Sequence, residues 1–241
     1  MQRSHLLATI SAVTSTVILG AIAPSALAYD FVPQQQGEIN VGLGCLDNCI
    51  DPGSIFDSIV SLEDETTGSR SRLFVDYFGE GDTEQRFDNG NIRLKTRDAG
   101  TTADGFWFRP SEYNESTGFS EEKGQLEVGT YLFNFSTKLA ELTIDFFDTE
   151  SSGTTGVLAI NGQEIGNPDF VSKGADGNIA SQTFTDVESI VIKFGLDRPQ
   201  GTGDGVDFRL SGEPAASVPE PASILGLLAI AGGSFMLKKS V

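Results

Sequence analysis

Short segments in which apolar and polar residues alternate run through most of the chain. In "TYLFNF" the side chains of Tyr131, Phe133 and Phe135 share one face, and "ELTIDFFD" (141–148) repeats the same period. A period of two is typical of a β-strand with one buried face. Further segments with this pattern are "SRLFVDYF", "NIRLKTRD", "GFWFRP", "GVLAING", "SQTFTDV", "SIVIKFGL" and "GVDFRL". The pattern therefore predicts a chain built mainly of short strands.

No long helical period separates these segments. The chain also holds 17 Phe residues, which suit pleated, half-buried surfaces better than helices. We predict an all-β fold, an antiparallel β-sandwich of jelly-roll type. In "GVDFRL" we expect Val206, Phe208 and Leu210 to point inward and Asp207 and Arg209 to point outward.

The N-terminal segment 1–28 has the pattern of a secretory signal peptide. Arg3 precedes an apolar run, and Ala26 and Ala28 form a small-residue cleavage site after Pro24. We expect export through the Sec machinery and cleavage after Ala28. The alternative is a retained N-terminal anchor, which the Thr and Ser residues within the apolar run disfavour.

The C-terminal region changes composition after the last predicted strand. The segment "SGEPAASVPEPAS" is rich in Pro, Ala and Ser, which predicts a spacer without secondary structure. We therefore divide the mature chain into a β-domain (29–212), a spacer (213–223) and a hydrophobic segment with a basic end (224–241).

The hydrophobic segment is a marginal membrane anchor. As a helix, its apolar part from Ile224 to Leu237 would be about 21 Å long, whereas the hydrocarbon core of a bilayer is about 30 Å thick. Lys238 and Lys239 follow directly, and snorkelling lysines with local thinning of the bilayer would let the helix span. Lysines at this end favour a cytoplasmic C-terminus and an exported body.

The same tail resembles the PEP-CTERM sorting signal of exosortase-equipped bacteria. The resemblance is carried by Pro219, Glu220 and Pro221, then the apolar stretch, then the basic end formed by Lys238 and Lys239. It implies that an integral-membrane exosortase recognises the Pro-Glu-Pro motif, removes the anchor and releases the protein toward the cell surface or extracellular matrix. The alternative is a permanent weak anchor.

A second resemblance lies in the body. The segments "GQLEVGTYLFNFSTKLAELTIDFFDTESSGTTGVLAING" and "GDGVDFRL" are similar to the LEVG subfamily of these proteins, named for the stretch that runs here from Leu126 to Gly129. The resemblance implies a location at the cell surface, associated with exopolysaccharide, and implies no activity.

Charge and histidine content exclude several function classes. The formal net charge of -18 repels nucleic-acid backbones and anionic lipid, so we expect no nucleic-acid partner and membrane contact only through the tail. The only histidine, His5, lies in the signal peptide. The mature chain therefore lacks the residues for a Ser-His-Asp triad or a histidine metal site, and we expect no enzyme.

The two cysteines, Cys45 and Cys49, lie in "GLGCLDNCIDPG". After export we expect a disulfide between them. Side chains four residues apart on a helix are about 5 to 6 Å apart at Cβ, farther than the roughly 3.8 Å of a disulfide, so a turn at Asp47 and Asn48 must close the bridge. The alternatives are free thiols or half of a zinc site.

Acidic turns offer hard oxygen ligands that suit a structural calcium ion. The favoured candidates are Asp204 and Asp207 in "GTGDGVDF"; "FDNGN" (Asp88, Asn89) and "GADGN" (Asp176, Asn178) are further candidates. None of these segments matches an EF-hand loop, and each is also compatible with a simple turn.

Two alternatives to a non-catalytic matrix protein remain. Jelly-roll domains often bind glycans through exposed aromatic side chains, which makes Trp107 in "GFWFRPSEY" a candidate glycan contact if Phe106 and Phe108 form the buried face. A glycosidase would need a carboxylate pair such as Glu127 and Asp145. With so many acids in the chain, a solvated coat is the stronger explanation for that pair.

Overall fold

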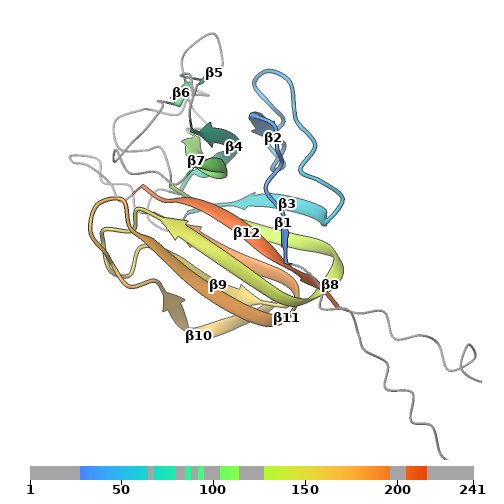
Figure 1. The fold of residues 1–241 in the computed structure, drawn as a ribbon, viewed down its shortest axis with the longest axis vertical. Helices are drawn as coiled ribbons and strands as arrows, with labels where there is room; N and C mark the ends of the chain where they lie inside the picture. The colour runs from blue at the N-terminus through green and yellow to red at the C-terminus, as the bar shows by residue number, and fades with distance from the viewer. Residues whose placement is uncertain are drawn as a thin grey trace, which may run out of the picture.

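The computed structural model describes residues 28–64, 68–79, 85–87, 92–94, 104–113, 128–195 and 205–215. These residues form an all-β, antiparallel architecture (Figure 1), which confirms the predicted fold class at this level. The strands are β1 (Tyr29–Asp30), β2 (Gly37–Ile39), β3 (Phe56–Leu62), β4 (Arg70–Phe78), β5 (Gln85–Phe87), β6 (Ile92–Leu94), β7 (Gly105–Tyr113), β8 (Gly129–Phe147), β9 (Gly156–Ile160), β10 (Gln163–Phe170), β11 (Ile179–Phe194) and β12 (Asp207–Pro214).

Nearly all of these strands belong to one 10-stranded sheet. Its order is β10-β9-β11-β8-β12-β7-β4-β2, with β3 paired to β8 and β1 paired to β12 outside this path. Strands β5 and β6 form a separate two-stranded sheet. Among the residues described, no helix has the length and apolar character needed to cross a membrane.

Two long strands, β8 with 19 residues and β11 with 16, run side by side through most of the sheet (Figure 1). The first part of β8 pairs with β3 and the second part with β12. The two parts are separated by the exposed residues Ser136, Thr137 and Lys138, which lie opposite a register shift between Val187 and Ser189 of β11. The sequence predicted two strands in each of these regions, whereas each region is one continuous strand that changes direction.

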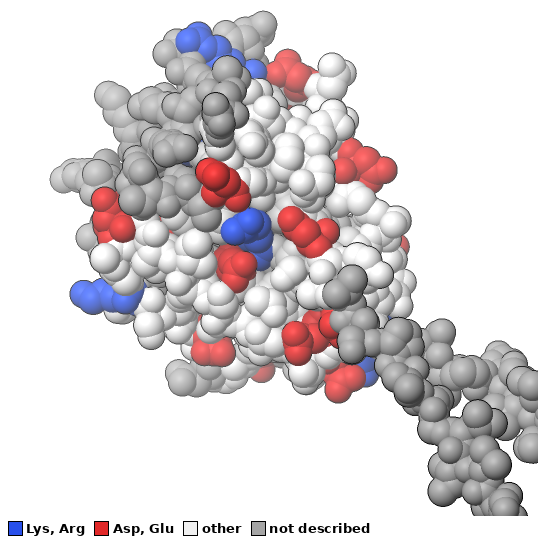
Figure 2. All heavy atoms as spheres, in the orientation of Figure 1, with Lys and Arg blue, Asp and Glu red and all other residues white. Residues whose placement is uncertain are grey.

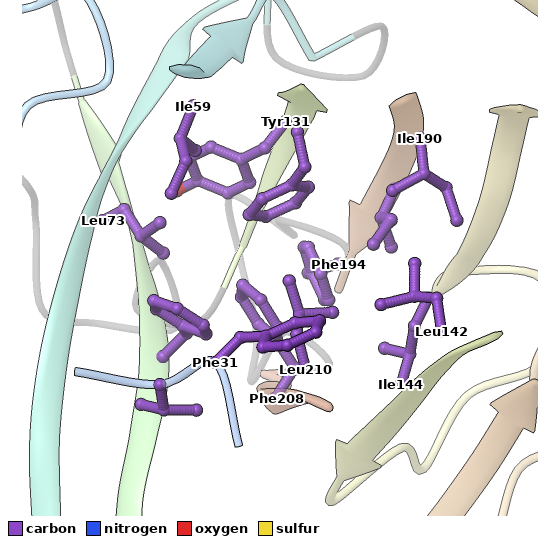
Figure 3. Packing of buried hydrophobic residues seen from close by; sticks show 14 of the residues in the cluster. Phe31, Ile59, Leu73, Tyr131, Leu142, Ile144, Ile190, Phe194, Phe208 and Leu210 are labelled. Atoms are coloured by element: carbon purple, nitrogen blue, oxygen red, sulfur yellow. The ribbon is translucent and has the colours of Figure 1, made fainter. Parts of the chain in front are cut away.

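The core lies between the two halves that this change of direction creates. The faces predicted from the sequence are buried, with Phe133 from the first part of β8 and Ile144 from the second part both in one hydrophobic cluster. Figure 3 shows side chains from both parts of the sheet converging on this cluster. At its centre Phe194 stacks on Phe208, with ring centroids 3.9 Å apart. The many Phe residues therefore join the halves into a sandwich-like body.

The alternation rule missed β3 and β10, and also the short strands β1, β2 and β5. In β3 a register shift between Phe56 and Ser58 interrupts the period of two, and β10 ("QEIGNPDF") contains Gly, Asn, Pro and Asp, which are rare in strands. Strand β12 also extends to Pro214, past the predicted domain end at residue 212. It does so because Glu213 pairs with Glu141, and Pro214 pairs with Leu139 after a register shift.

The pairing of β9 with β10 gives a test of the sheet. Gly156 pairs with Phe170 of β10, and a Cβ atom at this position would meet the backbone carbonyl oxygen of Asp169. We expect Gly156→Ala to lower the free energy of unfolding by about 1 to 3 kcal/mol, because backbone cannot move aside as a side chain can. Urea unfolding monitored by fluorescence of the single tryptophan measures this change.

The matched control is Gly166→Ala in the same hairpin, where a Cβ atom would meet open space. Equal losses of stability in the two variants would contradict the close approach of β10 to Gly156.

Candidate functional site

The face of β4 and β7 that points away from the main core is also buried, together with Asp207 at the start of β12. On β4 the residues with this orientation include Phe74 and Asp76, both 1% exposed or less, and Phe74 packs against Phe87 of β5 with ring centroids 4.5 Å apart. Ile92 and Leu94 of β6 join the same small cluster. The β5-β6 pair therefore covers a face that simple alternation would assign to solvent.

Charged side chains on this covered face are paired. The Nη1 atom of Arg109 lies 2.8 Å from Oδ2 of Asp76, and its Nε atom lies 3.7 Å from Oδ1 of Asp207. Its guanidinium group also lies 5.4 Å from the ring centroid of Phe78. Gln36 donates a hydrogen bond of 3.0 Å to Asp76. Burial raises the pKa of the Asp76 carboxyl group, since loss of hydration outweighs the attraction of Arg109.

The pairing of Asp207 with Arg109 argues against the prediction that Asp207 is a calcium ligand. The strand alternation was right in that Asp207 points away from Val206 and Phe208, but its carboxylate is only 3% exposed and faces Arg109. A guanidinium group at this distance already supplies the positive charge that a calcium ion would bring. The second predicted ligand, Asp204, lies outside the described residues.

Trp107 also requires a correction. Its side chain is fully buried, at 0% exposure, and its ring lies 5.6 Å from that of Phe147. The guanidinium group of Arg209 lies over the indole, 3.8 Å from the ring centroid. Trp107 does point away from Phe108, as expected, but a second layer covers it. It is therefore not available as a glycan contact.

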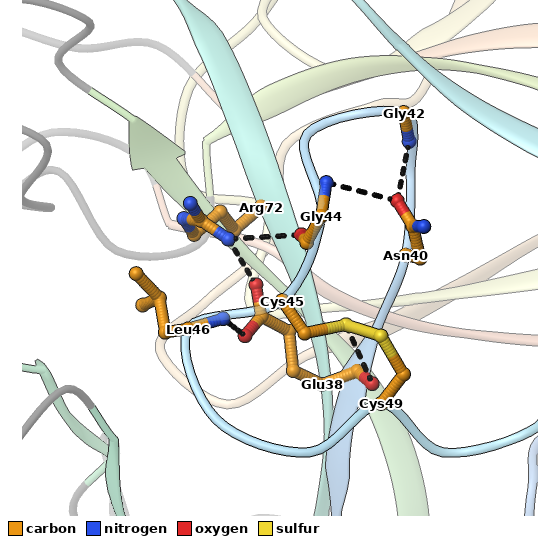
Figure 4. Close-up of a disulfide and its surroundings, with 8 residues drawn as sticks. All are labelled: Glu38, Asn40, Gly42, Gly44, Cys45, Leu46, Cys49 and Arg72. Carbon is orange, nitrogen blue, oxygen red and sulfur yellow. Dashed lines mark hydrogen bonds and ion pairs between the residues drawn. A yellow bond between two sulfur atoms is a disulfide. The ribbon is translucent and has the colours of Figure 1, made fainter.

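The structure joins Cys45 and Cys49 by a disulfide, with Cα atoms 5.6 Å apart. The bridged loop is fastened to the sheet by Glu38 of β2 (Figure 4). One carboxylate oxygen of Glu38 accepts a 2.6 Å hydrogen bond from the backbone N–H of Leu46, and the other pairs with Arg72 of β4. Burial raises the pKa of Glu38. The contacts of this loop are those of a structural element.

Three carboxylates meet where the β8-β9 and β10-β11 connections lie together. Ligand oxygens of Asp148, Glu150 and Asp176 are all within 4.8 Å of one another. The backbone N–H of Gly177 donates a 2.7 Å hydrogen bond to Asp148, and Asn178 donates one of 2.8 Å to the carbonyl oxygen of Thr149. These bonds fix the two connections against each other.

The sequence singled out Asp176 and Asn178 but gave no signal for their neighbours, which precede them by almost 30 residues. The side-chain amide nitrogen of Asn178 donates hydrogen bonds to the backbone carbonyl groups of Thr149 and Ala175. On the face drawn in Figure 2, acidic side chains lie on a largely uncharged surface, and several of them surround one basic side chain. The acidic group thus combines one residue predicted from the sequence with two that only the topology brings close.

The structure describes two of the other predicted site residues. Ala28 is exposed and precedes β1. Asp145 is half-buried and accepts a 2.6 Å hydrogen bond from Ser181. Outside the described residues lie Ala26, Asp88, Asn89, Glu127, Pro219, Glu220, Pro221, Lys238 and Lys239.

Known protein-family models, curated proteins and solved structures yield no match to this chain.

The buried charges give a direct test. We expect Arg109→Leu to lower the free energy of unfolding by about 3 to 5 kcal/mol, because it leaves Asp76 and Asp207 buried without their cation. Urea unfolding with tryptophan fluorescence, at pH 7 and fixed salt, provides the measurement. The control is Lys138→Ala, which breaks the exposed pair with Asp186 and should change stability little. A near-neutral Arg109→Leu variant would show that the pairing does not stabilise the second face.

Proposed function

We propose that this chain is an exported cell-surface or extracellular-matrix protein without catalytic activity, associated with exopolysaccharide. A short C-terminal helix holds it at the inner membrane until an exosortase cleaves it. The observation that carries the proposal is the order of the tail, in which the Pro-Glu-Pro motif at 219–221 precedes an apolar stretch and two lysines. Order and spacing together make this resemblance specific.

One feature of the described domain supports export. A disulfide between Cys45 and Cys49 suits an oxidising compartment outside the cytosol. The last described strand, β12, ends at Pro214, a few residues before the motif in the sequence. The finer fold assignment, a jelly-roll sandwich, belongs to this proposal and is favoured by the packing of the two sheet halves around one core.

The non-catalytic character rests on the chemistry available. A mature chain without histidine lacks the usual general base. The buried acids Glu38, Asp76 and Asp207 each lie beside an arginine, as expected of structural ion pairs. The glycosidase alternative would require a carboxylate pair such as Glu127 and Asp145, and Glu127 lies outside the described residues.

Replacing Glu220 tests the sorting proposal. We expect Glu220→Ala to leave export intact but to block removal of the tail. The flanking prolines keep the backbone extended while the charge that an exosortase would recognise is lost. Cell fractionation followed by mass spectrometry of the mature C-terminus measures both steps. Glu213→Ala, at the end of β12, is the control and should be processed normally. An intact tail on the wild-type surface protein would refute the proposal.

As a second part of the proposal, we infer that a structural calcium ion binds at Asp148, Glu150 and Asp176. Carboxylates held within 4.8 Å repel one another, and a divalent cation with oxygen ligands would remove this repulsion. Calcium at a hundredfold excess over its Kd would stabilise the native state by about 2.7 kcal/mol. For a domain of this size, that corresponds to a rise in Tm of roughly 5 to 10 °C.

The measurement compares thermal unfolding in calcium chloride with unfolding in sodium chloride of matched ionic strength, because diffuse screening acts in both salts. Asp176→Asn should abolish the extra stabilisation by calcium. The control Asp57→Asn, an exposed acid on β3, should retain it. Equal shifts in the two salts would mean that the three acids belong to the solvated coat.

A further inference from the structure

A groove of about 450 Å³ lies on the outer side of the sheet half formed by β3, β8, β11, β9 and β10. Its floor includes Val191 and Lys193 of β11, which alternate with the core residues Ile190 and Ile192 and therefore point away from the core. The volume falls within the range of about 300 to 1,000 Å³ that ligand pockets usually have. This groove shares no residue with the acidic group or the buried ion pairs at Arg109.

One wall of the groove is apolar and comes from the irregular strand β10. The register of β10 against β9 shifts between Glu164 and Asp169, and this stretch places Ile165, Pro168 and Phe170 along the groove. Phe170 is 37% exposed, one of the few large hydrophobic side chains with such exposure among the described residues. Its ring is available to a ligand, unlike that of Trp107.

The groove also has a polar end with a defined arrangement of charge. The ammonium group of Lys193 lies 3.8 Å from Oδ2 of Asp64, which also accepts a 3.3 Å hydrogen bond from Thr130. The buried carboxylate of Asp64 positions the ammonium group of Lys193 and neutralises its positive charge. Glu63 and Glu164 line the same groove and are exposed. The groove therefore has a net negative rim, in a protein of net charge -18.

We propose that this groove binds a neutral sugar unit of a polysaccharide. The C–H face of a pyranose ring packs against Phe170, while its hydroxyl groups donate to Glu63 and Glu164 and accept a hydrogen bond from Lys193. The inference rests on the proposed association with exopolysaccharide and gives that association a site and a substrate class. It moves the aromatic glycan contact from Trp107 to Phe170.

Charge and backbone chemistry disfavour other occupants. A uronic acid or phosphate group would be repelled by the two rim carboxylates, and an apolar peptide would strip water from them without returning hydrogen bonds. Pairing of β10 with a second copy is opposed by Pro168, which has no backbone N–H, and by the register shift beside it. A neutral ligand with many hydroxyl groups satisfies both the apolar wall and the polar end.

The test is calorimetric titration of the purified full-length chain with tetrasaccharides. The probes are neutral glucose, galactose and mannose oligomers beside uronic-acid oligomers of equal length. At least one neutral probe should bind, with affinity about tenfold weaker in Phe170→Ala and in Glu164→Gln. The matched controls are Tyr29→Ala, an exposed aromatic on β1, and Glu141→Gln, an exposed acid on β8. Both should bind as the wild type does.

Equal or tighter binding of the uronic-acid probes, unchanged affinity in Phe170→Ala, or no binding to any neutral probe would overturn the inference. Thermal unfolding of every variant verifies that a lost signal does not reflect an unfolded protein. Mass spectrometry of the C-terminus on the same groove variants separates the two proposals. If the chain is processed normally but binds no sugar, the proposed sugar site is wrong and the sorting proposal stands.

Discussion

The fold depends on one shared backbone ladder, the pairing of β8 with β11. Because both strands change direction at the same place, a single set of hydrogen bonds belongs to both halves of the sheet. The exposed segment Ser136–Lys138 and Asp186, with its positive φ of 60°, lie at this corner. Asp tolerates such a backbone better than most residues. Every other strand except the β5-β6 pair joins this ladder directly or through neighbours, so the corner sets how the inner faces meet.

The corner also explains where sequence reasoning succeeded. The alternation in "TYLFNF" and "ELTIDFFD" identified the correct inner faces, because each half of β8 is regular on its own. The polar residues Ser136, Thr137 and Lys138 interrupt the alternation between them, so the pattern predicts two strands and not one. Whether a polar interruption ends a strand or redirects it is decided by the partner strand, and the register shift in β11 lies about 50 residues away.

The cover over the outer face of β4 and β7 limits the prediction of burial in a different way. The sequence pattern predicts correctly that Trp107 and Asp207 point away from the core residues beside them. It does not predict that they are buried, because the segments that cover this face are distant in the sequence. A strand covered on both sides usually has apolar residues at every position. Here Arg109 and Asp76 supply charge to the second face, so the segment retains the polar alternation of a half-exposed strand. Because the paired residues are charged, the sequence pattern predicts that this face is exposed, although it is buried.

The proposed chemistry lies where the ladder is irregular. The groove owes its wall to the register shift in β10, and the acidic group owes its geometry to the connections on either side of the β9-β10 hairpin. Regular pairing uses backbone groups fully and leaves a flat surface, whereas a shifted strand turns side chains toward one another and forms a concavity. Those irregular stretches, rich in Gly, Asn, Pro and Asp, are the ones that strand propensity misses. The same composition that makes β10 hard to predict therefore allows it to form the wall of the proposed binding groove.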